Sequence, residues 1–186
     1  MKNDITLILK AASFAAEKHR TCEPRKDAEA TPYINHPLDV ARILADEGGV
    51  DDPEVIAAAL LHDTIEDTDT TADELRGLFG ERITELVLEV SDNKNLDKDV
   101  RKRHQIESAP HKSPGAALIK LADKTSNVRD VGSRPAVGWD EDRRKKYLEW
   151  AQRVVQALPI SNHSLKKVFQ DAVETSLALI QAKGTQ

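Results

Sequence analysis

A short segment around residue 62 concentrates groups that can bind a metal or transfer a proton. His62 is followed by Asp63, Glu66 and Asp67, directly after the apolar run at residues 59–61. In a helix, residues three and four positions apart are neighbours, so these side chains are expected to share one sector of the helix surface. Carboxylates this close repel one another unless a positive charge lies among them. A bound divalent metal would supply that charge.

Two further residues are candidates to complete such a site. His36 stands where a helix is expected to begin, and Asp123 ends the largely apolar stretch at residues 118–122. Asn127 follows Asp123 by four positions and is expected on the same helix face. A simpler interpretation stays open at this point. The segment 62–67 could be only the acidic end of a helix, although the helix dipole disfavours carboxylates there.

The elements that must position these residues are predicted to be helices. Pro37 and Pro53 stand where first helical residues belong, which makes His36 and Asp52 the expected N-caps. The helix from Glu54 to about Glu66 is apolar nearly all round, so we expect it to be the buried central helix. Periodicity and capping residues predict the other helices over residues 3–19, 37–48, 71–79, 83–90, 113–128, 139–158 and 161–177.

These patterns predict the fold class. No segment alternates as a strand does, and neither internal repeats nor a linker interrupts the chain. We therefore expect a single all-α domain over residues 1–186, a bundle of about eight to nine helices.

Composition narrows the classes of partner. Twenty-seven Lys and Arg residues against 32 Asp and Glu give a net charge of −5, which argues against general binding to nucleic acid or to an anionic membrane. No stretch approaches the roughly 18 apolar residues of a membrane helix, and no signal peptide is recognisable. The single cysteine, Cys22, excludes an intrachain disulfide and favours a reducing, cytoplasmic location. A homo-oligomer stays open.

Four short motifs, in this order, resemble those of one family. They are Arg25-Lys26, TPYINHP at residues 31–37, AALLHDTIEDT at residues 58–68, and KLADK at residues 120–124 followed by Asn127. Together they resemble the (p)ppGpp hydrolase domain of Rel/Spo proteins, which are HD-domain metal-dependent phosphohydrolases. The whole chain is similar to the small stand-alone alarmone hydrolases, the group that includes the metazoan SpoT homologue. This resemblance implies an all-α HD fold, a manganese ion, and removal of the 3′-pyrophosphate from ppGpp and pppGpp.

The resemblance also implies roles at the metal. The residues that match the family's ligand positions are His36, His62, Asp63 and Asp123. Two imidazoles and two carboxylates suit Mn²⁺, with Fe²⁺ or Zn²⁺ as alternatives. Glu66 and Asp67 match the acid/base pair that orients or deprotonates the attacking water.

Substrate-binding residues follow from the same resemblance. Arg25 and Lys26 match a basic loop whose guanidinium stacks on the guanine, and Asn127 and Tyr147 match contacts to the nucleoside sugar or phosphates. Further candidates for the distal phosphates are Lys98, Arg101 and Arg143, for which plain solvation is the alternative interpretation. The chain departs from the family pattern at Thr125-Ser126, where these enzymes often carry a larger residue before the asparagine.

Two other functions compete with ppGpp hydrolysis. The same HD site could act as an NADPH phosphatase or on another nucleotide, or the domain could bind a nucleotide or metal without catalysis. The presence of Glu66 and Asp67 argues against the binding module, because a binder needs no pair that activates water. Cys22 and His19 receive no role and are expected at the surface.

Overall fold

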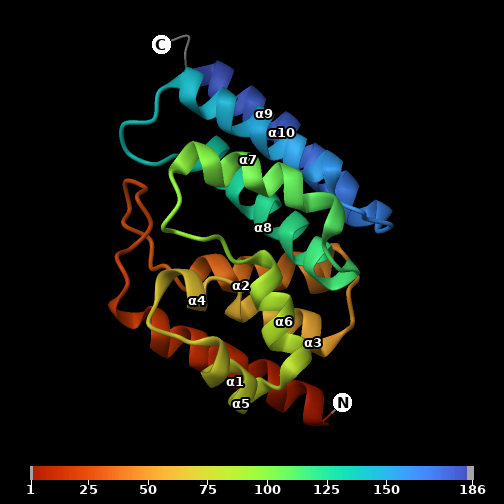
Figure 1. Cartoon of the computed structure of the whole chain (residues 1–186). Coiled ribbons are helices and arrows are strands. Elements are labelled where there is room, and N and C mark those ends of the chain that lie inside the picture. Colours follow the sequence, from red (N-terminus) through yellow and green to blue (C-terminus); the bar gives the residue numbers. More distant parts are fainter. Residues whose placement is uncertain (1, 184–186) are drawn as a thin grey trace.

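The computed structural model describes residues 2–183 and contains helices and loops, with no strand in that range (Figure 1). Its α-helices are α1 (Lys2–Lys18), α2 (Asn35–Arg42), α3 (Pro53–Leu61), α4 (Thr64–Asp67), α5 (Ala72–Phe79), α6 (Glu81–Val90), α7 (Lys98–Ser108), α8 (Pro114–Ser133), α9 (Glu141–Ala157) and α10 (His163–Lys183). A π-helical segment, Ile43–Glu47, continues α2, and short 3₁₀ turns occupy His19–Thr21 and Ala109–His111. The predicted all-α class is confirmed.

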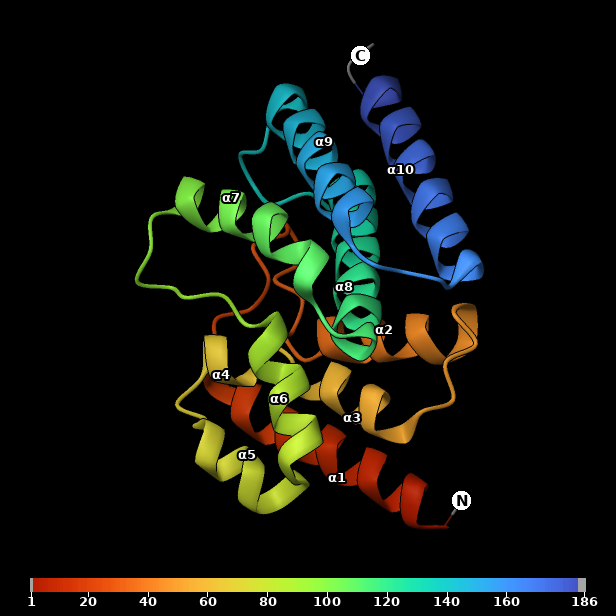
Figure 2. The ribbon, with the colours of Figure 1, turned by 45° about the vertical axis from the view of Figure 1, so that its right-hand side comes forward.

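The helices form two halves that meet at α8. Figures 1 and 2 show α1 to α6 in one half and α7 to α10 in the other. The helix α8 packs against α2, α3 and α6 of the first half and against α9 and α10 of the second. The side chains of α3 are buried from Val55 to Leu61, as its apolar sequence predicts. Residues at the ends of α2 and α3 therefore face the middle of α8.

Side-chain caps define several helix starts. The Asp52 side chain accepts hydrogen bonds from the first backbone N–H groups of α3, and Ser113 does the same for α8. Asn162 accepts from the Leu165 N–H at 2.9 Å and begins α10. One predicted cap is wrong, because His36 is the second residue of α2 and the helix begins at Asn35.

The central helix is shorter than predicted. It ends at Leu61, and the backbone turns at residues 62–63 before the single turn α4. The Thr64 hydroxyl donates to the Leu61 carbonyl at 2.7 Å, and the His62 ring contacts the Ala59 carbonyl at 2.8 Å. These side chains occupy carbonyls that a continuing helix would bond to its own backbone, so the helix stops here. The prediction of one continuous helix to Glu66 is therefore wrong.

Within the described part of the chain, no helix is both long enough and apolar enough to span a bilayer.

Candidate functional site

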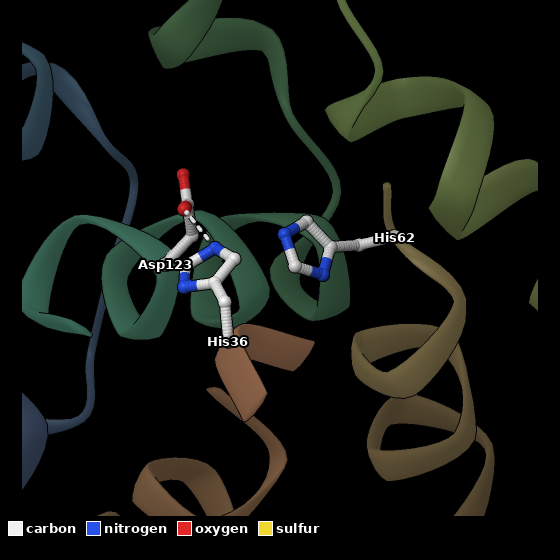
Figure 3. Close-up of side chains that lie close together, drawn as sticks. All are labelled: His36, His62 and Asp123. Carbon is white, nitrogen blue, oxygen red and sulfur yellow. Dashed lines mark ion pairs between the residues drawn. The ribbon is translucent and has the colours of Figure 1, made fainter. Parts of the chain in front are cut away.

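Three predicted metal ligands come together where α2, α3 and α8 meet. His36 comes from the start of α2, His62 from the residue after α3, and Asp123 from the middle of α8 (Figure 3). One potential ligand atom from each lies within 4.8 Å of the other two. All three side chains are buried, and His36 Nε2 lies 3.2 Å from Asp123 Oδ1. Two imidazoles and a carboxylate that converge in the interior could hold a metal ion.

The second ring nitrogen of each histidine is held away from the cluster. His62 Nδ1 lies 2.8 Å from the Ala59 carbonyl, and His36 Nδ1 lies 3.2 Å from Ser126 Oγ. Histidines that bind metals are oriented by such partners, which leave Nε2 free to act as a ligand. The Nε2 atom of His62 is buried and has no hydrogen bond of good geometry among residues 2–183, although Asp63 Oδ1 lies 3.1 Å away. A buried ring nitrogen that is unsatisfied in this way and stands next to a carboxylate fits a site that takes a metal ion.

The fourth predicted ligand, Asp63, lies beside this cluster. Its Oδ1 is 3.1 Å from His62 Nε2 and its Oδ2 is 3.8 Å from His36 Nε2. Burial alone would raise the pKa of Asp63, but the two imidazoles hold it well below the usual range. Burial lowers the pKa of His62, and the Asp63 carboxylate outweighs that effect and raises the pKa to about 9. The site therefore favours positive charge at its centre.

Two buried lysines form ion pairs with Asp123. Lys124 Nζ lies 3.0 Å from Asp123 Oδ2 and Lys120 Nζ lies 3.8 Å away, while Asn127 donates to Oδ1 at 2.5 Å. Burial would raise the pKa of Asp123, but Lys124 and the neighbouring His36 hold it well below its ordinary value. Asp123 therefore stays ionised. Both lysines belong to the KLADK motif at residues 120–124, but no role was predicted for them; their positions three before and one after Asp123 in a largely apolar stretch were the available signal.

The proposed acid/base residues lie on α4, directly after the ligands. Glu66 Oε2 accepts a hydrogen bond from the Asp92 backbone N–H at 3.0 Å, and burial raises the pKa of Glu66. Asp67 accepts a hydrogen bond from the Tyr33 hydroxyl at 2.5 Å and forms an ion pair with Lys94. Both carboxylates are partly buried beside the cluster, each held by a donor from a distant segment.

Arg25 and Asn127, two of the predicted substrate-binding residues, contact each other. Arg25 Nη2 donates to Asn127 Oδ1 at 3.0 Å and to Asp130 Oδ2 at 2.9 Å. Since Asn127 also bonds Asp123, the basic loop is connected through α8 to the cluster of His36, His62 and Asp123. Lys26 is exposed next to Arg25. Both basic residues line a cavity of about 460 Å³, which we call the loop cavity; it also reaches Tyr33, Asp67 and Lys94.

The other predicted substrate residues line a second cavity of about 510 Å³, on the surface of α7 and α9, which we call the cation cavity. Its basic residues are Lys98, Arg101, Lys102, Arg143 and Lys146, and its aromatic residues are Trp139, Tyr147 and Trp150. The Arg143 guanidinium lies 4.5 Å from the Trp139 ring centre. Asp92, whose backbone holds Glu66, also lines this cavity. The cation cavity therefore adjoins Glu66. Its five basic residues outnumber the three acidic ones, Asp92, Asp140 and Asp142, so its net positive charge suits a phosphorylated ligand.

Two residues that received no role in the sequence analysis lie close to the site. His19 was expected at the surface but is 4% exposed, and its ring stacks on Tyr33 with centroids 4.9 Å apart. Cys22 is half-buried, with Sγ 3.6 Å from His19 Nδ1. Burial and the carboxylates of Asp63 and Asp67 raise the pKa of Tyr33 far above its ordinary value. The position of Tyr33, three residues before the predicted ligand His36, was the sequence signal that it lies close to the site.

Known proteins resemble this chain over most of its length. The model of the HD domain family matches residues 11–158. A mouse protein named guanosine-3′,5′-bis(diphosphate) 3′-pyrophosphohydrolase MESH1 is 52% identical over 94% of this chain and 97% of its own length. The Drosophila melanogaster protein of the same name is 45% identical over 85% of this chain and 88% of its own length. A solved structure of a metazoan orthologue of SpoT, described as hydrolysing ppGpp, has a TM-score of 0.86 and 42% identity, covering 90% of this chain and 94% of that one.

Proposed function

The chain belongs to the HD-domain family, and we propose that within it the protein is a guanosine-3′,5′-bis(diphosphate) 3′-pyrophosphohydrolase. It would take ppGpp or pppGpp and water to GDP or GTP and pyrophosphate. The observation that carries the proposal is the buried convergence of His36, His62 and Asp123, with Glu66 and Asp67 beside it. The relatives that carry this activity in their names match almost the full chain.

We assign Mn²⁺ to this site, held by His36, His62, Asp63 and Asp123. Two nitrogen and two oxygen donors form a mixed set that suits this ion. When bound, a divalent ion lowers the pKa of a coordinated water and polarises the phosphorus under attack. The lysines behind Asp123 keep that carboxylate ionised, and the Ala59 carbonyl and Ser126 keep the two rings in place.

Glu66 is the proposed general base. A base works best when its pKa approaches the working pH, and burial shifts the pKa of Glu66 upward. The hydrogen bond from the Asp92 N–H holds one oxygen of Glu66, so the carboxylate keeps a defined orientation. Asp67 is the second member of the pair and assists in orienting the water.

The substrate carries several negative charges, which the protein meets with two groups of cations. We propose that Arg25, with Lys26 beside it, stacks on the guanine, since a planar guanidinium can lie against an aromatic base. Asn127 and Tyr147 would contact the sugar or its phosphates. Lys98, Arg101 and Arg143, in the cation cavity, would bind the phosphates remote from the reaction. We propose that this one domain acts in the cytoplasm without a nucleic-acid partner, in keeping with the net charge of −5.

The test is product release with controlled metal. Protein stripped with EDTA is expected to release no pyrophosphate from ppGpp, and added Mn²⁺ is expected to restore release better than Zn²⁺ does. NADPH is assayed in parallel for phosphate release. Full activity of the stripped protein with EDTA present would contradict the metal assignment. Phosphate release from NADPH without pyrophosphate release from ppGpp would contradict the assignment of ppGpp as the substrate.

The variant Glu66→Gln separates chemistry from binding. It keeps the shape of the side chain but loses the basic oxygen, so turnover is expected to fall roughly 10²–10⁴-fold. Metal stoichiometry and ppGpp affinity are expected to stay at the wild-type level. Turnover close to wild type would remove Glu66 from the mechanism, and loss of the metal would make Glu66 a ligand instead of the base.

A further inference from the structure

Tyr33 connects the two sets of carboxylates in the site. It lies in the loop before α2, and its hydroxyl is 2.8 Å from Asp63 Oδ2 and 2.5 Å from Asp67 Oδ2. Asp63 belongs to the proposed metal ligands and Asp67 to the proposed acid/base pair. Among the residues that the structure describes, this hydroxyl contacts both carboxylates.

The two carboxylates need such a partner because of where the backbone puts them. They flank α4, a single helical turn in which the Asp67 N–H donates to the Asp63 carbonyl at 2.8 Å. A helix this short has little stability of its own. The carboxylates also repel each other at this spacing. The single proton of the Tyr33 hydroxyl points between the two carboxylate oxygens and is shared by them, which offsets part of that repulsion and links both ends of the turn.

The tyrosine ring is itself held from three directions. One face stacks on the buried ring of His19, at an interplanar angle of 25°. The Tyr33 carbonyl accepts a hydrogen bond from the His36 N–H at 3.0 Å, and the edge of the His36 ring lies against the tyrosine. The hydroxyl therefore has little freedom to move relative to His36, which is itself another of the proposed metal ligands.

From this arrangement we infer that Tyr33 is a positioning residue, whose hydroxyl holds Asp63 and Asp67 in a fixed relation to each other. The inference rests on the proposed function, since it concerns the proposed ligand and the proposed acid/base carboxylate. Tyr33 acts through these two side chains and not on the substrate. Its loss therefore affects turnover and metal affinity while leaving the basic residues that bind nucleotide in place.

The test is Tyr33→Phe in the full chain. Phenylalanine keeps the stack on His19 and the backbone bond to His36 and removes only the hydroxyl. At saturating Mn²⁺ we expect kcat for ppGpp to fall about 10- to 100-fold with KM within about threefold of wild type. Mn²⁺ affinity, measured by titration calorimetry without nucleotide, is expected to fall about tenfold. The matched control is Thr84→Val on α6, which removes a buried hydroxyl bonded to the Gly80 carbonyl.

The outcomes separate this inference from the proposed function. If the wild type hydrolyses ppGpp, a kcat of Tyr33→Phe within twofold of wild type overturns the positioning role, and a selective fall in kcat supports it. If the wild type releases no pyrophosphate, the proposed function fails, and the Mn²⁺ affinity measured by calorimetry alone decides whether Tyr33 positions the carboxylates. In that case a Mn²⁺ affinity of Tyr33→Phe equal to that of Thr84→Val overturns the inference, and a tenfold lower affinity supports it. If Tyr33 had a purely structural role, Tyr33→Phe would lower the melting temperature and would not lower kcat selectively relative to KM.

Discussion

A metal-binding histidine depends on both of its ring nitrogens. For His36 to offer Nε2, its proton must reside on Nδ1, where Ser126 Oγ lies 3.2 Å away and can accept it. Ser126 is 2% exposed and stands at one of the two positions where the chain departs from the family pattern. The hydroxyl of its neighbour Thr125 donates to the Leu121 carbonyl within the same helix. The small residue at position 126 thus has a specific partner in this protein.

Ser126→Ala is expected to weaken Mn²⁺ binding about 10- to 100-fold, because the His36 ring loses the partner that fixes its tautomer and orientation. Calorimetric titration of metal-stripped protein measures the affinity directly. The matched control is Ser133→Ala on the same helix, where the hydroxyl bonds only to the Arg129 carbonyl. Equal affinities in the two variants would show that His36 is oriented without Ser126.

At the scale of elements, an ion pair joins the π-helical segment after α2 to α8. Arg129 donates to both oxygens of Glu47, at 2.8 and 2.7 Å, and Arg42 approaches the same carboxylate at 3.0 Å. The hydrogen bonds from Arg129 are the largest cause of a lowered pKa at Glu47. Two-point pairing of this kind resists sliding of one helix along another. Glu47 follows the C-terminal end of α2, whereas the loop that carries Tyr33 precedes this helix, so the pair supports the helix that positions His36.

Glu47→Gln is expected to cost about 1 kcal/mol of unfolding free energy at pH 7, a modest value because the pair is partly exposed. The pKa of Glu47 in the folded state lies below the ordinary value of 4.5, so the pair stabilises the protein above that pH. The contribution is lost as the pH falls through the folded-state pKa. Urea unfolding of wild type and variant should therefore differ at pH 7 and converge as the pH is lowered below that range. The exposed Glu149 on α9, changed to Gln, serves as the control. A difference that persists undiminished at low pH would contradict the assignment.

At the scale of the whole molecule, α8 is the element through which the two halves and the site hold together. It carries Asp123 and contacts five other helices, and its end packs tightly against α10. A Cβ atom at Gly132 would lie 2.7 Å from the Ser176 backbone Cα, closer than side chains are found. The buried Arg144 of α9 donates to the carbonyls of Val131 and Gly132 at the same end. Glycine is therefore required at position 132 by packing between helices.

Gly132→Ala is expected to lower unfolding free energy by about 1–3 kcal/mol, because the added methyl group forces α8 and α10 apart. Thermal unfolding measures the effect. Gly77→Ala in α5 is the matched control, since a Cβ there meets none of the described residues within 4 Å. In that exposed helical position alanine is expected to stabilise the protein by about 0.5–1 kcal/mol. Two changes of the same sign would contradict the packing argument.

What the sequence determined by itself is the part of the structure that depends on near neighbours along the chain. The predicted cap at Asp52 acts over two or three residues, and the apolar periodicity of each helix acts over a turn or two. These signals predict the all-α class, most helix starts and the burial of α3. The family motifs point to the proposed ligands and the proposed acid/base pair, and the structure brings His36 of α2, His62 after α3 and Asp123 of α8 together.

The tertiary structure alone decided the contacts that orient these residues. Tyr33 and Asp67 are 34 positions apart, and His36 and Ser126 are 90 apart, so no local pattern pairs them. The turn at residues 62–63 also escaped prediction, because two side chains that suit a helix bond to the last carbonyls of α3 instead. His19 was expected at the surface because it received no role, and only the fold shows the Tyr33 ring stacked on it. Such contacts form when helices far apart in sequence pack together, and they depend on the packing of the whole bundle.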